Sequence, residues 1–263
     1  MKSMNTFFNN IQIFSPLDQF EIRNLLSIDL PVLGNLQFSL TNIGLYLIIS
    51  TIFIILLGLL STNYNKLVGD NWSISQEALN ATILNTVVGQ INPKEGQKFF
   101  PFIYTLFIFI LINNLIGLVP YSFASTSHMI LTISLSTVVV LGATILGLAK
   151  HGLKFFSLFV PAGIPLALLP MLVIIEFISY SVRCISLGLR LGANITTGHL
   201  LLHILSSFTY IIMSQGVLFF VAGLIPLSFI VAFTGLEFAV AAIQALVFVI
   251  LTCNYIKDGL DLH

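Results

Sequence analysis

The sequence predicts an all-α, polytopic membrane protein, and three observations lead to that fold class. Hydrophobic residues make up 57% of the 263 residues and charged residues only 8%, whereas a soluble domain holds about 25% charged residues. Several apolar segments are long enough to cross a bilayer, which takes about 20 residues. A spanning segment must also satisfy its own backbone hydrogen bonds, and an uninterrupted helix does so without partners.

Three segments have the length and composition of conventional transmembrane helices. We expect them over 39–60, 99–119 and 129–149. Two further segments predict amphipathic helices on the membrane surface. Residues 15–36 mix charged side chains with Leu and Ile, and residues 73–91 interrupt an apolar helical pattern with Glu, Asn and Gln.

The last third of the chain holds two helical patterns that are too long for one perpendicular crossing. They cover 171–205 and 216–257, with a turn near 210–216 between them. Each would measure roughly 50–60 Å as a helix, whereas the hydrocarbon core is about 30 Å thick. Each segment therefore breaks into two spans or stays continuous and strongly tilted. The lack of an internal Gly-Pro loop in 171–205 favours the continuous helix.

Charge balance and cysteine content exclude several other classes. Ten Lys and Arg residues balance ten Asp and Glu residues, so we expect no nucleic-acid partner. The phosphate-binding pattern GxxxxGK[ST] is missing, so we expect no nucleotide. Cys184 and Cys253 lie in apolar runs and match neither a disulfide framework nor a zinc pattern. The sequence thus predicts no cofactor, and lipid as the surrounding medium.

The lysines predict an orientation in the membrane. Six of them fall on one side if 171–257 forms a single hairpin, namely Lys66, Lys94, Lys98, Lys150, Lys154 and Lys257. The loops on the opposite side, 120–128 and 206–214, hold no Lys or Arg. The positive-inside rule then predicts an inside C-terminus and an outside N-terminus.

Polar residues recur every seven positions in both long segments. Seven residues turn a helix to about 20° short of two full turns, so each set forms one stripe. The first stripe holds Glu176, Arg183, Arg190 and Thr197, with Asn194 at its edge, and the second holds Glu237, Gln244 and Asp258. A charge at bilayer depth costs about 2.5–3.5 kcal/mol, so such residues normally face protein or a water-filled cavity.

A structural ion pair between the helices is the simplest explanation of these charges, but it is incomplete. Arg183 has Glu176 or Glu237 as a partner, which leaves Arg190 without a carboxylate at its own level. An unpaired buried charge costs several kcal/mol, and arginine does not lose its proton. A carboxylate from another chain removes this cost, so we expect the protein to be a subunit of a complex.

Two histidines and a set of small residues accompany the first stripe, and their roles stay open. His199 lies about 180° round the helix from Arg190, and His203 follows one turn later. Proton relay, a metal site without an evident third ligand and a structural pair are the alternatives. The small residues fit packing within the chain or against a partner helix; they are Ser186, Gly188, Gly192, Ala193 and Gly198.

Several motifs together resemble the a-subunit family of F-type ATP synthases, in its fungal mitochondrial form. They are SLGLRLGAN at 186–194, GHLLLH at 198–203, NNLIGLVP at 113–120, YIKD at 255–258 and SPLDQFE at 15–21. The resemblance covers nearly the whole chain. It implies that 171–205 and 216–257 form a strongly tilted hairpin. It also implies a cleaved leader of residues 1–14, which leaves 15–263 as a single membrane domain.

The resemblance further implies a proton-conducting stator subunit with no catalytic site of its own. Arg190 would meet the ionisable carboxylate of each passing c-ring subunit and separate two offset half-channels. The residues that match the outer half-channel are His199, Glu237, Asn194 and Gln244. Those that match the matrix-side half-channel are Glu176 and Asp258. Secondary candidates are Arg183, His203 and His263.

The implied partners are the c-ring subunits and the other membrane and peripheral-stalk subunits of the synthase. The implied location is the mitochondrial inner membrane, with the N-terminus in the intermembrane space and the C-terminus in the matrix. Two other functions stay open. A secondary transporter could bind an anion at Arg183 and Arg190, although no inverted repeat or broken helix supports it. A structural membrane scaffold is the second.

Overall fold

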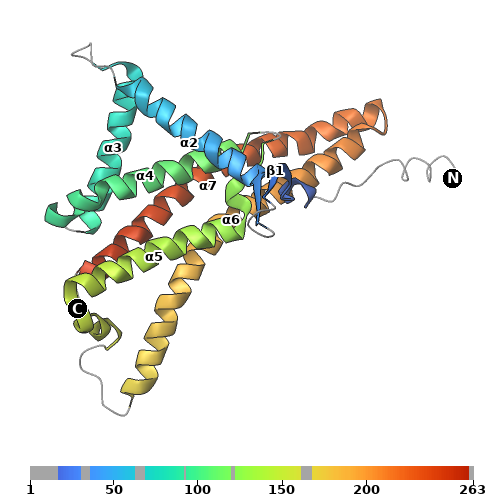
Figure 1. The fold of residues 1–263 in the computed structure, drawn as a ribbon. Helices are drawn as coiled ribbons and strands as arrows, with labels where there is room; N and C mark the ends of the chain where they lie inside the picture. The colour runs from blue at the N-terminus through green and yellow to red at the C-terminus, as the bar shows by residue number, and fades with distance from the viewer. Residues whose placement is uncertain are drawn as a thin grey trace.

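The computed structural model describes residues 17–30, 36–62, 69–91, 93–119, 122–160 and 168–260. Six α-helices account for most of this part of the chain, which confirms the predicted all-α class (Figure 1). Five of them are long and apolar enough to cross a membrane. The expected leader over 1–14 and the candidate residue His263 lie outside the described residues.

Helices α2, α4 and α5 correspond to the three predicted conventional spans. They cover Asn42–Ser61, Pro93–Gly117 and Met129–His151. The Thr41 side chain caps α2 by accepting a hydrogen bond from the Gly44 amide. Gly152 ends α5 with a φ of 58°, which glycine adopts readily and other residues rarely do. A short 3-10 helix, η4, follows over Gly152–Phe159.

Helix α3 corresponds to the surface helix predicted over 73–91. It covers Asn71–Gln90 and is not among the candidate spans. Its buried face holds Ile83 and Val87, and the Tyr104 hydroxyl of α4 donates a 2.7 Å hydrogen bond to Gln76 Oε1. These contacts fix α3 beside α4, and most of its polar residues are exposed.

The surface helix predicted over 15–36 is wrong. The described part of this segment forms a 3-10 turn, η1 (Asp18–Phe20), and a strand, β1 (Asn24–Leu30). Strand β1 pairs antiparallel with β2 (Leu36–Thr41). Apolar and polar residues alternate from Leu26 to Leu30, and a period of two is typical of a strand. The mixed composition of the segment concealed this alternation.

Helices α6 and α7 are continuous, which decides between the two alternatives left by the sequence. They cover Leu169–Met213 and Val217–Leu260, 45 and 44 residues, so each measures about 65 Å. A turn at Gly216, with a φ of 143°, joins them. Pro226 lies inside α7 without ending it. The hairpin extends beyond the other helices, and the first turns of α6 diverge from α5 (Figure 1).

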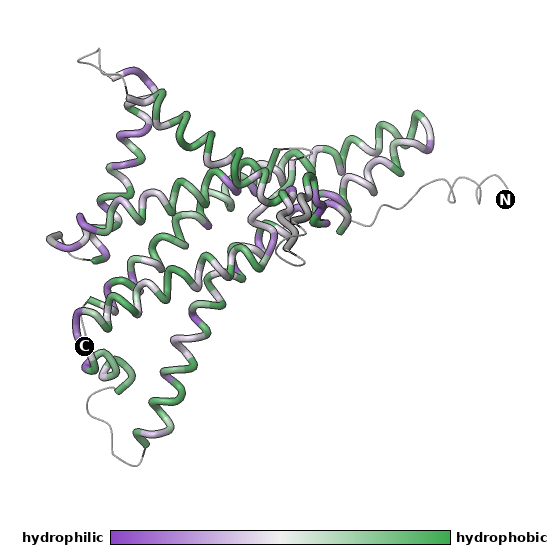
Figure 2. The backbone as a smooth tube through the Cα atoms, in the orientation of Figure 1, coloured by the Kyte–Doolittle hydropathy of each residue, from purple (hydrophilic) through white to green (hydrophobic). Residues whose placement is uncertain are grey.

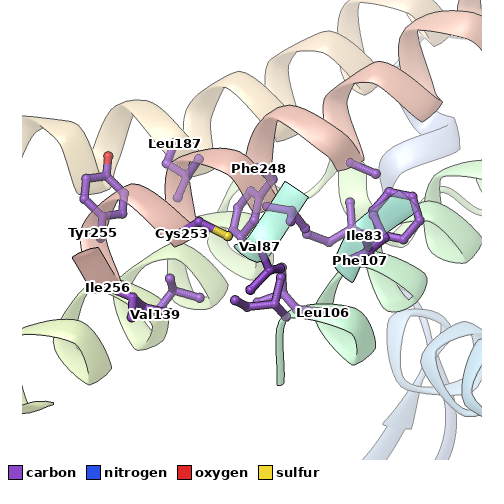
Figure 3. Close-up of a cluster of buried hydrophobic side chains, with 14 of the residues drawn as sticks. Ile83, Val87, Leu106, Phe107, Val139, Leu187, Phe248, Cys253, Tyr255 and Ile256 are labelled. Atoms are coloured by element: carbon purple, nitrogen blue, oxygen red, sulfur yellow. The ribbon is translucent and has the colours of Figure 1, made fainter. Parts of the chain in front are cut away.

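The buried core lies where α3, α4, α5 and the hairpin meet. Ile83 and Val87 pack with Phe107 of α4 and with Phe248 and Cys253 of α7 (Figure 3). Much of the outward surface of the long helices is also apolar (Figure 2). An apolar exterior around a modest core is the arrangement expected of a protein whose solvent is lipid.

Two of the small residues of α6 pack within the chain. A Cβ at Gly188 would lie 2.7 Å from Ile133 Cα, and a Cβ at Gly192 would lie 2.9 Å from Thr132 Oγ1. Both neighbours belong to α5. Intra-chain packing therefore explains these two glycines, and no partner helix is needed for them.

The described lysines gather at one end of the molecule. Lys150 at the end of α5 forms a 3.2 Å ion pair with Glu95 at the start of α4. His151 Nε2 lies 2.8 Å from the carbonyl oxygen of Leu260, so the end of α7, with Lys257, is there too. Of the lysines in the orientation argument, Lys150 and Lys257 therefore share one end, whereas Lys66 lies outside the described residues and the orientation itself stays a prediction.

Candidate functional site

The antiparallel pairing of α6 and α7 brings the two polar stripes together at two separate levels. At one level the Glu237 carboxylate lies against Gly198. At the other, Asp258 Oδ2 lies 3.9 Å from a guanidinium nitrogen of Arg183. Gln244 lies between these levels along α7, because it follows Glu237 by seven residues and precedes Asp258 by fourteen.

The level of Arg183 and Asp258 is a cavity of about 540 Å³ that is lined by both arginines of the stripe. We call it the arginine cavity; it is lined by Ser179, Val182, Arg183, Ser186, Leu187, Arg190, Leu251, Asn254, Tyr255 and Asp258. Arg183 contacts two carboxylates there, Glu176 Oε1 at 3.8 Å and Asp258 Oδ2 at 3.9 Å. All three side chains are partly exposed. Of the two partners expected for Arg183, the structure gives Glu176, and it adds Asp258.

Arg190 differs from Arg183 although it lies on the same stripe. Its side chain is exposed and forms no ion pair or hydrogen bond with any residue that the structure describes. Beside it runs an open groove of about 460 Å³ on the outer face of α6, lined by Val182, Ile185, Ser186, Leu189, Arg190 and Ala193. A permanent cation thus lies beside an apolar groove, with no carboxylate of the described residues within ion-pair distance.

The level of Glu237 is a cavity of about 800 Å³, which we call the histidine cavity. His199, His203 and Glu237 line it, with Ser122 and Thr234 among the other polar residues. Glu237 is only 8% exposed. Neither of its carboxylate oxygens has a hydrogen-bond partner within the described residues, and neither has His199 Nε2. Buried polar atoms of this kind are normally satisfied by water, so the cavity is suited to a hydrated path.

The remaining predicted residues are less closely engaged. Asn194 and Gln244 are half-buried and line neither cavity. His199 and His203 share the histidine cavity, but among the residues that the structure describes no group of three or more His, Cys, Asp or Glu side chains could hold a metal ion.

Sequence reasoning missed the contribution of the N-terminal segment. Gln19 of η1 lines the histidine cavity, and the Phe20 ring meets the His199 ring edge to face, with centroids 6.4 Å apart. Phe123 also lines the cavity and stacks on His128 at 5.2 Å, where burial lowers the pKa of His128 and favours its neutral form. No periodic signal connects η1 with α6, so the sequence could not show this contact.

Comparisons with known proteins agree along nearly the whole chain. The family model described as "ATP synthase A chain" matches residues 44–257. "ATP synthase subunit a" of Podospora anserina is 67% identical over 264 residues, which covers 99% of this chain and 100% of the relative. The Neurospora crassa protein of the same name is 68% identical, over 97% of this chain and 98% of its own. That of Kluyveromyces lactis is 52% identical, over 97% and 99%.

Proposed function

This chain belongs to the ATP synthase A chain family, and from that premise we propose that its two cavities are the two ends of a divided proton route. Membership makes the chain the proton-translocating stator subunit of an F-type ATP synthase, a multi-pass membrane subunit without a catalytic site of its own. Its closely similar relatives are fungal. The proposal concerns which residues carry the proton.

The outer half of the proposed route uses the histidine cavity. A proton enters through it, is handed on by His199 and Glu237, and neutralises a carboxylate of the rotor. A neutral carboxyl group can face lipid, whereas the charged form cannot. The large cavity with its several polar side chains and the buried, unpartnered carboxylate support this assignment. Asn194, Gln244 and His203 would act along this half as polar neighbours.

The inner half of the proposed route uses the arginine cavity. After the rotor has turned, its carboxyl group loses the proton toward Glu176 and Asp258, and the resulting anion pairs with Arg190. The two acids are held within 4 Å of one guanidinium, that of Arg183, which keeps a polar outlet open beside Arg190. The membrane potential supplies about 2.3 kcal/mol per charge for each 100 mV.

The observation that carries the proposal is the contrast between the two arginines of the stripe. Arg183 has two carboxylates within 4 Å, whereas Arg190 has none within that distance among the described residues and lies beside apolar side chains. Arginine does not lose its proton, and a charge in lipid is costly. A carboxylate of a second protein, presented again and again by a rotating c-ring, satisfies Arg190 and leaves the groove free for the ring to pass.

The location and orientation belong to the same proposal. We place the protein in the mitochondrial inner membrane, with the N-terminus in the intermembrane space and the C-terminus in the matrix. The lysines gathered near the ends of α5 and α7 support a matrix-facing C-terminus. The histidine cavity then opens toward the intermembrane space. Other membrane and peripheral-stalk subunits would hold this stator against the ring.

Replacing Arg190 by alanine in the whole synthase tests the proposal. We expect the complex to assemble, because the described chain gives Arg190 no partner to lose, and proton-driven ATP synthesis to fall by about 100-fold or more, as expected when a fixed transition-state charge is removed. Arg23→Ala is the matched control, since Arg23 is exposed and pairs with Glu21 at 3.0 Å; it should behave as wild type.

Each rival function makes a different prediction for Arg190→Ala. A scaffold predicts failed assembly or an unchanged rate of ATP synthesis. A secondary transporter predicts loss of anion uptake by the isolated subunit, with synthesis unaffected. Either result would remove the proposed proton route.

A further inference from the structure

Gly198 of α6 lies directly against the carboxylate of Glu237 on α7. A Cβ placed at position 198 would overlap Glu237 Oε1 and would lie 2.9 Å from Cδ and 3.5 Å from Cγ. Real Cβ atoms essentially never come within 3.0 Å of another heavy atom. The Glu237 side chain therefore occupies the space that any side chain at position 198 would need.

The obstacle at Gly198 is the end of a flexible side chain, which distinguishes it from Gly188 on the same helix. A Cβ at Gly188 would lie 2.7 Å from Ile133 Cα and 2.8 Å from the Thr132 carbonyl oxygen, both backbone atoms of α5. A methyl group there must push two helices apart. At position 198 a methyl group needs only the carboxylate to move, and the fold can stay as it is.

The histidine cavity offers the Glu237 carboxylate an alternative position. Glu237 lines the histidine cavity of about 800 Å³, yet it is only 8% exposed, and no described residue donates a hydrogen bond to either oxygen. Water in the cavity would attract a charged carboxylate outward. Because Gly198 has no side chain, the Glu237 carboxylate can lie against α6 at the position next to His199.

We propose that Gly198 is a positioning residue for proton transfer, because its lack of a side chain seats the Glu237 carboxylate against α6 and out of the open part of the histidine cavity. This inference rests on the proposed role of Glu237 in the outer half of the proton route. It assigns Gly198 no contact with the proton itself. Its importance follows from geometry, since a displacement of about 1 Å at a reacting group can cost up to 100-fold in rate.

The test is a pair of substitutions measured together in the assembled synthase. We expect Gly198→Ala to assemble normally and to lower proton-driven ATP synthesis about tenfold, because the methyl group displaces the carboxylate. In a Glu237→Asp background the shorter side chain leaves room for that methyl group. The same Gly198→Ala change should then lower the rate by less than about twofold relative to Glu237→Asp alone.

Gly235→Ala is the matched control, because Gly235 lies on α7 and a Cβ there would meet nothing within 4 Å; its rate should equal that of wild type. The inference fails if Gly198→Ala keeps the wild-type rate, or if its loss is equally large in the Glu237→Asp background. Failure of Gly198→Ala to assemble also overturns it, because the helices and not the carboxylate would then have yielded.

Glu237→Gln separates this inference from the function on which it rests. If the glutamine variant synthesises ATP like wild type, the proposed role of Glu237 is wrong and Gly198 has nothing to position. If Glu237→Gln is inactive while Gly198→Ala is not impaired, only the positioning role is wrong. Loss in both variants, with the loss from Gly198→Ala relieved by Glu237→Asp, supports both.

Discussion

The arginine cavity and the histidine cavity lie on the same pair of helices, but they differ in the exposure and the pairing of their carboxylates. In the arginine cavity, Glu176 and Asp258 share the guanidinium of Arg183, and all three side chains remain partly exposed. In the histidine cavity, Glu237 is 8% exposed and meets neither a cation nor a hydrogen-bond donor among the described residues. The arginine cavity thus keeps its charged groups paired and partly exposed, whereas the histidine cavity buries the Glu237 carboxylate without a partner among the described residues.

The difference shows what each cavity can do with a proton. The carboxylates of the arginine cavity are partly exposed beside a permanent cation, so a proton released there is within reach of water. A buried carboxylate without a cationic partner is relieved only by water or by a bound proton. Under the proposed function, the histidine cavity holds the proton and the arginine cavity releases it.

The largest expected effect comes from removing the buried acid. Glu237→Gln keeps the size of the side chain but removes its ability to bind and release a proton. We therefore expect proton-driven ATP synthesis to fall by about 100-fold or more. Asp258→Asn should cost only about threefold to tenfold, because Arg183 and Glu176 remain as a polar outlet. Synthesis rates in coupled membrane vesicles measure both. Equal losses in the two variants would contradict the contrast between the cavities.

Much of this contrast could be predicted from the sequence, because helical geometry converts spacing into position. The seven-residue recurrence of Glu176, Arg183 and Arg190 fixes one stripe, and the hairpin then sets the stripe of Glu237 and Asp258 against it. The shortage of carboxylates for Arg190 was also visible. These inferences needed only the period of the helix and a count of charges.

What the sequence could not give depends on contacts between distant segments. Whether Arg183 would turn to Glu176, Glu237 or Asp258 depends on how far α7 slides along α6. The strand pairing of Asn24–Leu30 with Leu36–Thr41 was hidden by a composition that also suits a surface helix. The approach of Phe20 to His199 joins residues far apart in the chain, and no local pattern reports such a contact.

The next effect concerns Gly188 of α6, and we expect it to change assembly and not proton transfer. Gly188→Ala places a methyl group against the backbone of α5, and overpacking of this kind costs about 1–3 kcal/mol. We expect less assembled synthase and a lower unfolding temperature of the membrane sector, measured by native electrophoresis and thermal denaturation. Gly142→Ala, where a Cβ would meet nothing within 4 Å, is the control. Unchanged assembly of Gly188→Ala would show that α5 and α6 tolerate the extra volume.

The arginine cavity predicts a smaller effect. Arg183→Gln removes the cation that both Glu176 and Asp258 approach, so the two acids lose the partner that they share. We expect ATP synthesis to fall by about fivefold, and assembly to stay at the wild-type level, because partly exposed ion pairs add little stability. High salt should narrow the gap between variant and wild type, since it screens exposed charges. A failure to assemble would mean that Arg183 holds the hairpin together and does not serve the outlet.

The smallest expected effect on ATP synthesis comes from changing Phe20, at the N-terminal edge of the histidine cavity. Phe20 contacts His199 ring edge to face, and such pairs contribute about 0.5–1.5 kcal/mol. Phe20→Ala should therefore slow ATP synthesis by about twofold to fivefold through a less fixed imidazole. Phe20→Tyr keeps the ring and should retain most of the rate. Ile22→Ala, at a half-exposed residue just beyond η1, should leave the rate unchanged. If Ile22→Ala slowed synthesis as much as Phe20→Ala, the effect would come from general loosening of the segment and not from the ring that supports His199.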